Sequence, residues 1–243
     1  MSRFLLIVLL ALPWMGWSAE ACVTNAECDD GSVCTGSEIC QAGFCIPGTP
    51  LTCDDGNVCT VDSCDSVLGC VYTPTDSCPL SGRDMALSIT TDHRFKLRTG
   101  TGMAGPAFPA NNTADDPVQN GASLRVFTTM GDGFDNTYPM PGVKWEYRGA
   151  PAVTTGYTYR DIHNVYGPVA LVVIREGKPA KIKARGSSLN FTLATDPSPV
   201  NVVLRFGNSG RRYCLQYGGD TKFNPGVRFQ SRAAQAPTAC PSP

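Results

Sequence analysis

Ten of the twelve cysteines lie before residue 80, and their spacing repeats. The cysteines at positions 28, 34, 40, 45 and 53 recur at positions 53, 59, 64, 70 and 78, an offset of 24 or 25 residues. This part of the chain has few large apolar side chains, so disulfide bonds must replace a hydrophobic core. We therefore predict a disulfide-rich domain over residues 22–80 with two repeats, 28–53 and 53–78. The spacing leaves the pairing of its cysteines open.

The second repeat resembles a known family. The stretch Cys53–Cys64, followed by Gly69–Pro74, is similar to the cysteine-rich repeat of slime-mould extracellular-matrix and spore-coat proteins, which also occurs in exported bacterial proteins. The first repeat is similar to it less closely, because its central spacing is one residue longer. The resemblance implies an extracellular structural or spacer role and brings no catalytic residues.

The N-terminal residues have the pattern of a secretory signal peptide. Arg3 is followed by an apolar run and then by small residues, and the run is shorter than the ~20 residues of a membrane span. We predict a signal peptide over residues 1–21, with cleavage after Ser18 or Ala21. The alternative is an uncleaved N-terminal anchor. No later stretch is apolar enough to predict a transmembrane segment, so the expected location is secreted, extracellular or at the cell surface.

The formal net charge of -1 conceals two parts of opposite charge. Residues 20–80 carry ten acidic side chains and no Lys or Arg, a charge of -10. Residues 81–243 carry 19 basic and 11 acidic side chains, a charge of +8, and Arg3 is the remaining basic residue. The net charge therefore describes neither part of the chain.

After residue 80 the sequence alternates between apolar and polar residues, with frequent Gly, Pro and Asn between the alternating runs. No segment keeps a 3.6-residue apolar period, so we predict a mainly β protein whose residues 81–243 form an antiparallel β-sandwich or jelly-roll-like domain. The predicted strands are residues 93–98, 122–128, 143–148, 157–160, 169–175, 180–185, 190–193, 200–206, 212–217 and 227–229. Residues 100–121 are predicted to form a long loop. Cys214 and Cys240 are predicted to pair, because they are the only two cysteines in this part.

The alternation predicts that basic side chains cover the outside of a sheet. These residues are Arg94, Lys96, Arg98, Lys181, Lys183 and Arg185. Such a face is ordinarily only a solvated surface, and it could also bind an anionic polymer such as a polysaccharide. We favour a third interpretation, in which this face docks the acidic cysteine-rich part of the same chain or of a neighbour. No nucleic-acid partner is expected.

Calcium is the one metal that the sequence suggests. Asp54, Asp55, Asn57 and Asp62 place several oxygen ligands around one glycine, and Asp29, Asp30 and Ser32 form a poorer version in the first repeat. The alternative is that each Asp-Asp-Gly sequence forms an Asx turn, in which the carboxylates accept backbone N–H groups. No other cofactor is expected.

Two pairs of aromatic residues give a second hypothesis. Trp145, Tyr147, Tyr157 and Tyr159 alternate along two predicted strands, and if exposed they could form a platform for sugar rings. We favour the interpretation that they line the core of the sandwich, since aromatic side chains fill such cores routinely.

Catalytic motifs are missing from the sequence. The chain has two histidines, His93 and His163, and no Gly-x-Ser-x-Gly, His-Glu-x-x-His, phosphate-binding or dinucleotide-binding motif. Carboxylates in or near loops are the remaining candidates for a glycoside-cleaving pair: Asp115, Asp116, Asp132, Asp135 and Asp161. We predict that the protein is not an enzyme. Asn111 and Asn190 lie in glycosylation patterns, which matter only in a eukaryotic host.

The second part of the chain resembles an uncharacterised domain of exported bacterial proteins. The similar stretches are residues 138–141, 156–161 and 212–219 and the final Ala-Cys-Pro. This resemblance implies a compartment and no activity. We therefore predict an exported, non-enzymatic structural or assembly protein of the extracellular matrix or cell surface, such as a filament component, with self-association or other extracellular proteins as its partners. The alternative is a glycan-binding or adhesive module, with a polysaccharide as its partner.

Overall fold

The computed structural model describes residues 21–57, 59–103, 108–150 and 153–241. The predicted signal peptide, apart from Ala21, lies outside these residues. By packing, the chain divides into unit 1, which is Met1–Cys53 with Cys64–Val71, and unit 2, which is Asp54–Ser63 with Tyr72–Pro243. Part of the second repeat thus belongs to unit 2, whereas the predicted domain boundary is at residue 80. No helix among the described residues is long and apolar enough to cross a membrane.

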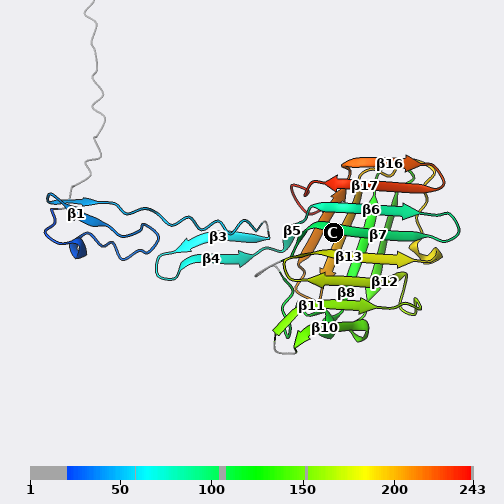
Figure 1. Cartoon of the computed structure of the whole chain (residues 1–243), viewed down its shortest axis with the longest axis horizontal. Coiled ribbons are helices and arrows are strands. Elements are labelled where there is room, and N and C mark those ends of the chain that lie inside the picture. Colours follow the sequence, from blue (N-terminus) through cyan, green and yellow to red (C-terminus); the bar gives the residue numbers. More distant parts are fainter. Residues whose placement is uncertain (1–20, 58, 104–107, 151–152, 242–243) are drawn as a thin grey trace, which may run out of the picture. The chain divides into compact units, whose positions relative to one another are not determined.

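Unit 1 is held together mainly by disulfide bonds. It contains a short 3-10 helix, η1 (Asn25–Glu27), and a hairpin of β1 (Ile39–Gln41) and β2 (Phe44–Ile46), drawn in blue in Figure 1. Ala42 and Gly43 in the hairpin turn both have positive φ angles, 53° and 83°, as a two-residue type I′ turn requires. The described apolar residues that unit 1 buries are the half-cystines at positions 22 and 28. Disulfides therefore replace the core, as the composition predicts.

The disulfide pairing in unit 1 follows the repeat. Each repeat joins its first cysteine to its fourth, which gives Cys28–Cys45 and Cys53–Cys70. The second cysteine of the first repeat pairs with the third cysteine of the second repeat, which gives Cys34–Cys64. The third cysteine of the first repeat pairs with the cysteine that precedes the repeat, which gives Cys22–Cys40. Successive repeats are thus covalently linked as well as internally closed.

The second repeat forms a two-stranded sheet of β3 (Thr60–Asp65) and β4 (Gly69–Pro74). Asp65 Oδ1 accepts hydrogen bonds from the backbone N–H groups of Val67 and Leu68 at 2.9 and 2.8 Å and so fixes the turn between the strands. These backbone donors hold the pKa of the Asp65 carboxyl below its usual value.

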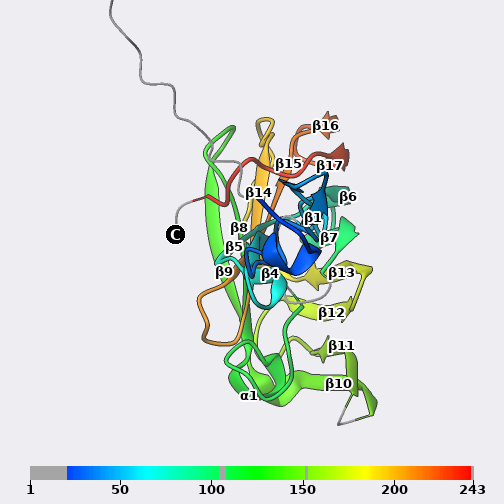
Figure 2. The same cartoon turned by 90° about the vertical axis from the view of Figure 1, so that its left-hand side faces the viewer.

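Unit 2 is a sandwich of an eight-stranded and a five-stranded sheet, whose two layers are visible in Figure 2. The larger sheet has the order β10 (Trp145–Ala150), β11 (Val153–Arg160), β12 (Val169–Arg175), β13 (Lys178–Arg185), β7 (Arg94–Gly102), β6 (Gly82–Ser88), β17 (Arg228–Ala234) and β16 (Asp220–Asn224). The smaller sheet has the order β5 (Ser77–Pro79), β15 (Arg212–Tyr217), β14 (Val200–Phe206), β8 (Ala122–Thr128) and β9 (Phe134–Met140). The recorded strand pairs are antiparallel except for β5 with β15.

Three short helical turns lie in the connections of unit 2: α1 (Pro117–Asn120), η3 (Gly142–Lys144) and η4 (Ser187–Leu189). Asp116 caps α1, because its side chain accepts a hydrogen bond from Val118 N, and Pro117 occupies the first helical position. Strands make up 49% of the residues and helices 6%, so the predicted mainly β class is confirmed.

The core of unit 2 lies between its two sheets (Figure 2) and consists of buried side chains from both of them. Four predicted strands have the observed bounds, namely β8, β12, β14 and β15. The prediction of a strand at residues 190–193 is wrong. Phe191 and Leu193 alternate because both insert into the core, while Asn190 has a left-handed φ of 46° that ends any strand.

Four strands of the sandwich were not predicted: β5, β6, β9 and β16. Three of them, β5, β9 and β16, are edge strands, which tolerate polar residues and prolines such as Pro139 because they pair on one side only. β6 has the sequence Gly-Arg-Asp-Met-Ala-Leu-Ser, in which helix-forming residues conceal the alternation. Its two strand neighbours override this local preference.

The C-terminal tail is tied to the smaller sheet by the predicted disulfide between Cys214 and Cys240. Cys214 is fully buried on β15, and Arg212 Nη1 donates a hydrogen bond to Pro241 O at 2.8 Å. The disulfide closes a loop with a sequence separation of 26 residues.

The double variant Cys214→Ala/Cys240→Ala should lower the unfolding free energy of unit 2 by about 3.5 kcal/mol, because the unfolded chain regains the entropy of the open loop. Urea unfolding followed by the fluorescence of Trp145, which is buried in unit 2, measures this change. An unchanged urea midpoint would show that the C-terminal tail packs on the sheet equally well without the disulfide.

Candidate functional site

The six predicted basic residues lie in register on two adjacent strands of the larger sheet. Lys183 is paired with Lys96 across β13 and β7, and the same register pairs Lys181 with Arg98 and Arg185 with Arg94. The intervening side chains of both strands are buried in the core, so the basic side chains point away from it. Five of the six are exposed and Lys181 is half-buried. The structure thus brings these residues together as three like-charged pairs.

Neighbouring strands extend this surface. Leu171 of β12 and Arg160 of β11 continue the row of Lys183, while Arg228 and Arg232 of β17 continue the rows on the other side. We call this surface the basic face, and its basic residues are Arg94, Lys96, Arg98, Arg160, Lys181, Lys183, Arg185, Lys222, Arg228 and Arg232. The acidic residues in the same rows are Asp84, Glu146 and Asp220. Among the described residues, none of the basic residues of this face forms an ion pair.

Part of the basic face is hollowed. A depression of about 520 Å³ is lined by five basic side chains and by the apolar residues Ile162, Ala170 and Leu171. The five basic residues are Arg94, Lys96, Arg160, Lys183 and Arg185. The hollow also has a carboxylate, Asp92, at its margin. Its lining therefore combines strong positive charge with an apolar surface.

A structured loop forms one rim of this hollow. The buried Asp161 accepts hydrogen bonds from the backbone N–H groups of Val165 and Tyr166 at 3.1 and 2.7 Å. Arg185 Nη2 donates to Ile162 O at 2.6 Å and so attaches the loop to β13. The carboxylate of Asp161 thus has a structural role.

The aromatic residues of the alternative hypothesis are inside the sandwich. Trp145, Tyr157 and Tyr159 are at most 4% exposed, and Tyr147 is half-buried and packs against the core. Tyr157 Oη donates to Pro109 O at 2.9 Å, and burial raises the pKa of Tyr159 to about 12. An exposed sugar platform made of these residues is therefore wrong, and the favoured interpretation of a core position holds.

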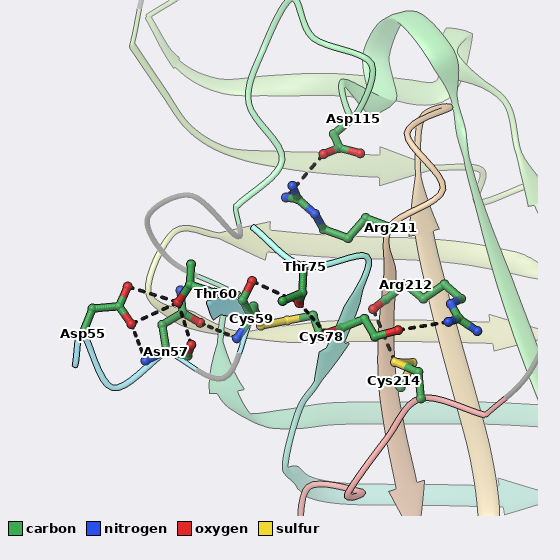
Figure 3. The surroundings of a disulfide bond; sticks show 12 residues. Asp55, Asn57, Cys59, Thr60, Thr75, Cys78, Asp115, Arg211, Arg212 and Cys214 are labelled. Carbon is green, nitrogen blue, oxygen red and sulfur yellow. Dashed lines mark hydrogen bonds and ion pairs between the residues drawn. A yellow bond between two sulfur atoms is a disulfide. The ribbon is translucent and has the colours of Figure 1, made fainter. Parts of the chain in front are cut away.

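The acidic loop of the second repeat is an Asx turn. Asp54 Oδ1 accepts from Gly56 N at 2.7 Å, and Asp55 Oδ1 accepts from Asn57 N at 2.8 Å. Thr60 Oγ1 donates to the same Asp55 carboxylate at 3.0 Å, as Figure 3 shows beside the disulfide of Cys59 and Cys78. Each carboxylate thus keeps a fixed position in the turn.

The first repeat forms the same hydrogen bonds. Asp29 Oδ1 accepts from Gly31 N, and Asp30 Oδ1 accepts from Ser32 N, both at 2.8 Å. Thr35 Oγ1 donates to Asp30 as Thr60 does to Asp55. The recurring sequence therefore encodes a recurring turn.

The turns also gather carboxylates. Ligand oxygens of Asp54, Asp55 and Asp62 lie within 4.8 Å of one another. Asp29, Asp30 and Glu38 form a second group of this kind. In the second repeat, Asp62 Oδ1 is buried without a hydrogen-bond partner among the described residues, whereas Asn57 Oδ1 accepts from Cys59 N at 3.1 Å. Three of the four predicted calcium ligands thus lie together, and calcium binding stays a prediction.

The loop carboxylates have structural partners. Asp115 pairs with Arg211 at 3.4 Å (Figure 3), and Asp135 pairs with Arg125 at 2.6 Å. Asp116 caps α1 and accepts from Tyr147 Oη at 2.8 Å.

Asp132 ties the end of one loop to another segment of unit 2. The hydroxyl groups of Thr192 and Thr195 and the backbone N–H of Ala194 donate to its carboxylate, and they hold the pKa of Asp132 below its usual value. His93 contacts the carbonyl and the ring of Phe191.

Sequence reasoning missed several residues of the basic face. Arg160 lies at the end of a predicted strand, and Arg228 and Arg232 lie on β17, of which only the start was predicted. The alternation in the Arg-Phe-Gln-Ser-Arg sequence of β17 could have predicted that Arg228 and Arg232 face outward. The sheet topology places β17 next to β6, and the sequence pattern does not predict this neighbour.

The calcium hypothesis has a direct test. Calcium at a tenfold excess over its Kd should stabilise the folded chain by about 1.4 kcal/mol and so raise the melting temperature. The variant Asp54→Asn should remove this shift, whereas Asp76→Asn, which removes an exposed carboxylate outside the cluster, should keep it. A melting temperature that is insensitive to calcium in the unmodified chain would exclude the site.

Comparison with known proteins gives a family match in the cysteine-rich part and a match to one protein. Residues 52–75 match the family described as the Dictyostelium (slime mold) repeat. The chain is also 48% identical over 59 residues to Protein psiQ of Dictyostelium discoideum, and these residues are 24% of this chain and 6% of that protein. No solved structure matches. The resemblance predicted for the second repeat is thus confirmed, whereas the resemblance of the C-terminal part to an exported bacterial domain stays a prediction.

Proposed function

We propose that this protein is an exported, non-enzymatic structural protein of the extracellular matrix or cell surface that assembles with neighbouring copies. In this assembly the acidic cysteine-rich part of one chain docks on the basic face of another. The observation that carries the proposal is the register of like charges across β7 and β13, without ion-pair partners among the described residues.

Like charges that lie directly opposite each other destabilise a sheet. Here three such pairs are adjacent, so their repulsion adds up over one surface. A partner that brings carboxylates to this surface removes the repulsion and gains attraction. The basic face is therefore suited to an acidic protein surface.

The chain itself contains a surface of the required charge. Residues 20–80 have ten acidic and no basic side chains, and the Asx turns hold four of the carboxylates in fixed positions: Asp29, Asp30, Asp54 and Asp55. Disulfides and turns order these groups before binding, so little conformational entropy is lost on docking.

One further observation supports an extracellular structural role. All twelve cysteines are paired in six disulfides, a state that persists in oxidising compartments. A contact between two different surfaces of identical chains is heterologous, and unless it closes into a ring it generates a filament. The proposed docking is of this kind, which supports the expectation of a filament component. The burial of Trp145 and its neighbours removes the aromatic platform on which the glycan-binding alternative was based.

Self-association should depend strongly on salt. At about 20 mM sodium chloride the purified protein should form oligomers that dissociate at about 500 mM, because the Debye length falls well below its ~10 Å value at 0.1 M. Sedimentation velocity at both concentrations measures the change. A protein that stays monomeric at both would contradict the proposed assembly.

The variant Lys183→Glu should weaken this association about tenfold, equivalent to ~1.4 kcal/mol, because it places a carboxylate in the centre of the basic face. The matched control is Arg205→Glu, which changes the charge equally on β14 of the other sheet and should associate normally. Equal weakening in both variants would show that total charge, rather than this face, governs association.

A further inference from the structure

A furrow runs along β6 on the outer side of the larger sheet. Its floor consists of the small outward side chains Ala86 and Ser88, while the neighbouring strands carry long basic side chains beside them. In register, Ala86 lies beside Lys96, and Ser88 lies between Arg94 and Arg228. The difference in length between the short side chains of β6 and the long side chains on either side of it forms a groove.

Two hollows of about 410 and 320 Å³ make up this furrow. They are adjacent, because both are lined by Ala86, Lys96 and Arg228. The furrow follows the strand, so its shape suits an extended ligand. It lies within unit 2 and is separated from Lys183 and Arg160 by β7.

The walls of the furrow carry one sign of charge. Arg94, Lys96, Arg228 and Arg232 are exposed and form no ion pair among the described residues. The furrow contains one acidic side chain, Asp84, which lies at one end, 3.8 Å from Arg83 Nε. The rest of the furrow is an unneutralised positive groove.

The lining limits the class of polyanion. Strand β6 is paired on both sides, so a peptide cannot add to it as a further strand. Neither hollow is lined by an aromatic side chain, so nucleic-acid bases have no surface on which to stack.

The lining also offers groups that suit a hydroxylated chain. Ser88, Thr90 and Gln230 line the furrow, and their side chains make no hydrogen bond within the described part of the protein. Hydroxyl and amide groups of this kind can donate to and accept from sugar hydroxyls.

We propose that the furrow along β6 binds a linear acidic polysaccharide. The carboxylate or sulfate groups of the polysaccharide lie against Arg94, Lys96 and Arg228, and its hydroxyl groups bond to Ser88 and Gln230. This ligand goes beyond the proposed assembly, since it lies along β6, and the furrow shares only Arg94 and Lys96 with the hollow near Lys183. Matrix polysaccharide and a neighbouring copy of the protein would then compete for Arg94 and Lys96.

The test uses polygalacturonate as a carboxylated probe, dextran sulfate as a sulfated probe and neutral dextran as the control, with the full chain and calorimetric detection. The variant Ala86→Phe fills the floor without changing charge, and Arg228→Glu reverses one wall charge. Each should weaken binding of an acidic polysaccharide about tenfold or more, and salt should weaken it further. Matched controls are Val173→Phe, which adds bulk to β12, and Arg205→Glu on the other sheet. Both controls should bind normally, and circular dichroism confirms that all four variants fold.

Three results would overturn the proposal. The first is that neither acidic polysaccharide binds better than neutral dextran. The second is that Arg228→Glu weakens binding while Ala86→Phe does not, because the attraction then comes from diffuse charge rather than from the furrow. The third is that polyglutamate binds as tightly as the polysaccharides with the same response to the variants, because an acidic protein segment is then the ligand. The salt-dependent self-association of Ala86→Phe, measured in parallel, reports separately on the proposed assembly.

Discussion

The structure of unit 2 depends on the alternation of apolar and charged side chains along β7 and β13. Phe95, Leu97 and Ile182 are buried in the core, and the side chains between them must face outward. A slip of one residue would turn the charges inward, so the core determines the register. That register places Lys96 opposite Lys183, and the burial of apolar side chains thereby creates the basic face.

The cysteine-rich part solves a different physical problem. It has too few apolar side chains for a core, and covalent links take the place of packing. The bond between Cys34 and Cys64 connects the two repeats, while Cys28–Cys45 and Cys53–Cys70 close each repeat on itself. Because hairpins and Asx turns then order the short loops, the carboxylates of Asp30 and Asp55 occupy equivalent places. A repeated sequence thus becomes a repeated arrangement of negative charge.

Predictions from the local sequence pattern were correct where one feature of the sequence was enough to make them. The alternation located β8, β12, β14 and β15 with their observed bounds, and elimination paired Cys214 with Cys240. The sequence-based predictions failed where the neighbouring strands determine whether a segment becomes a strand. β6 has a helix-like sequence and becomes a strand only between β7 and β17. The furrow was therefore invisible in the sequence: Ala86 and Ser88 form its floor only because longer side chains flank them on other strands.

The sequence by itself determined the mainly β class, the two-repeat organisation and the opposite charges of the two parts, because periodicity, spacing and composition are local properties of the chain. The tertiary structure alone decided which cysteines of the repeats pair, that Trp145 and Tyr157 are buried, and that the basic residues form one face with a furrow beside them. These features depend on which strands become neighbours in the sheets. The burial of a shared core determines this strand order through contacts between residues that are far apart in the sequence.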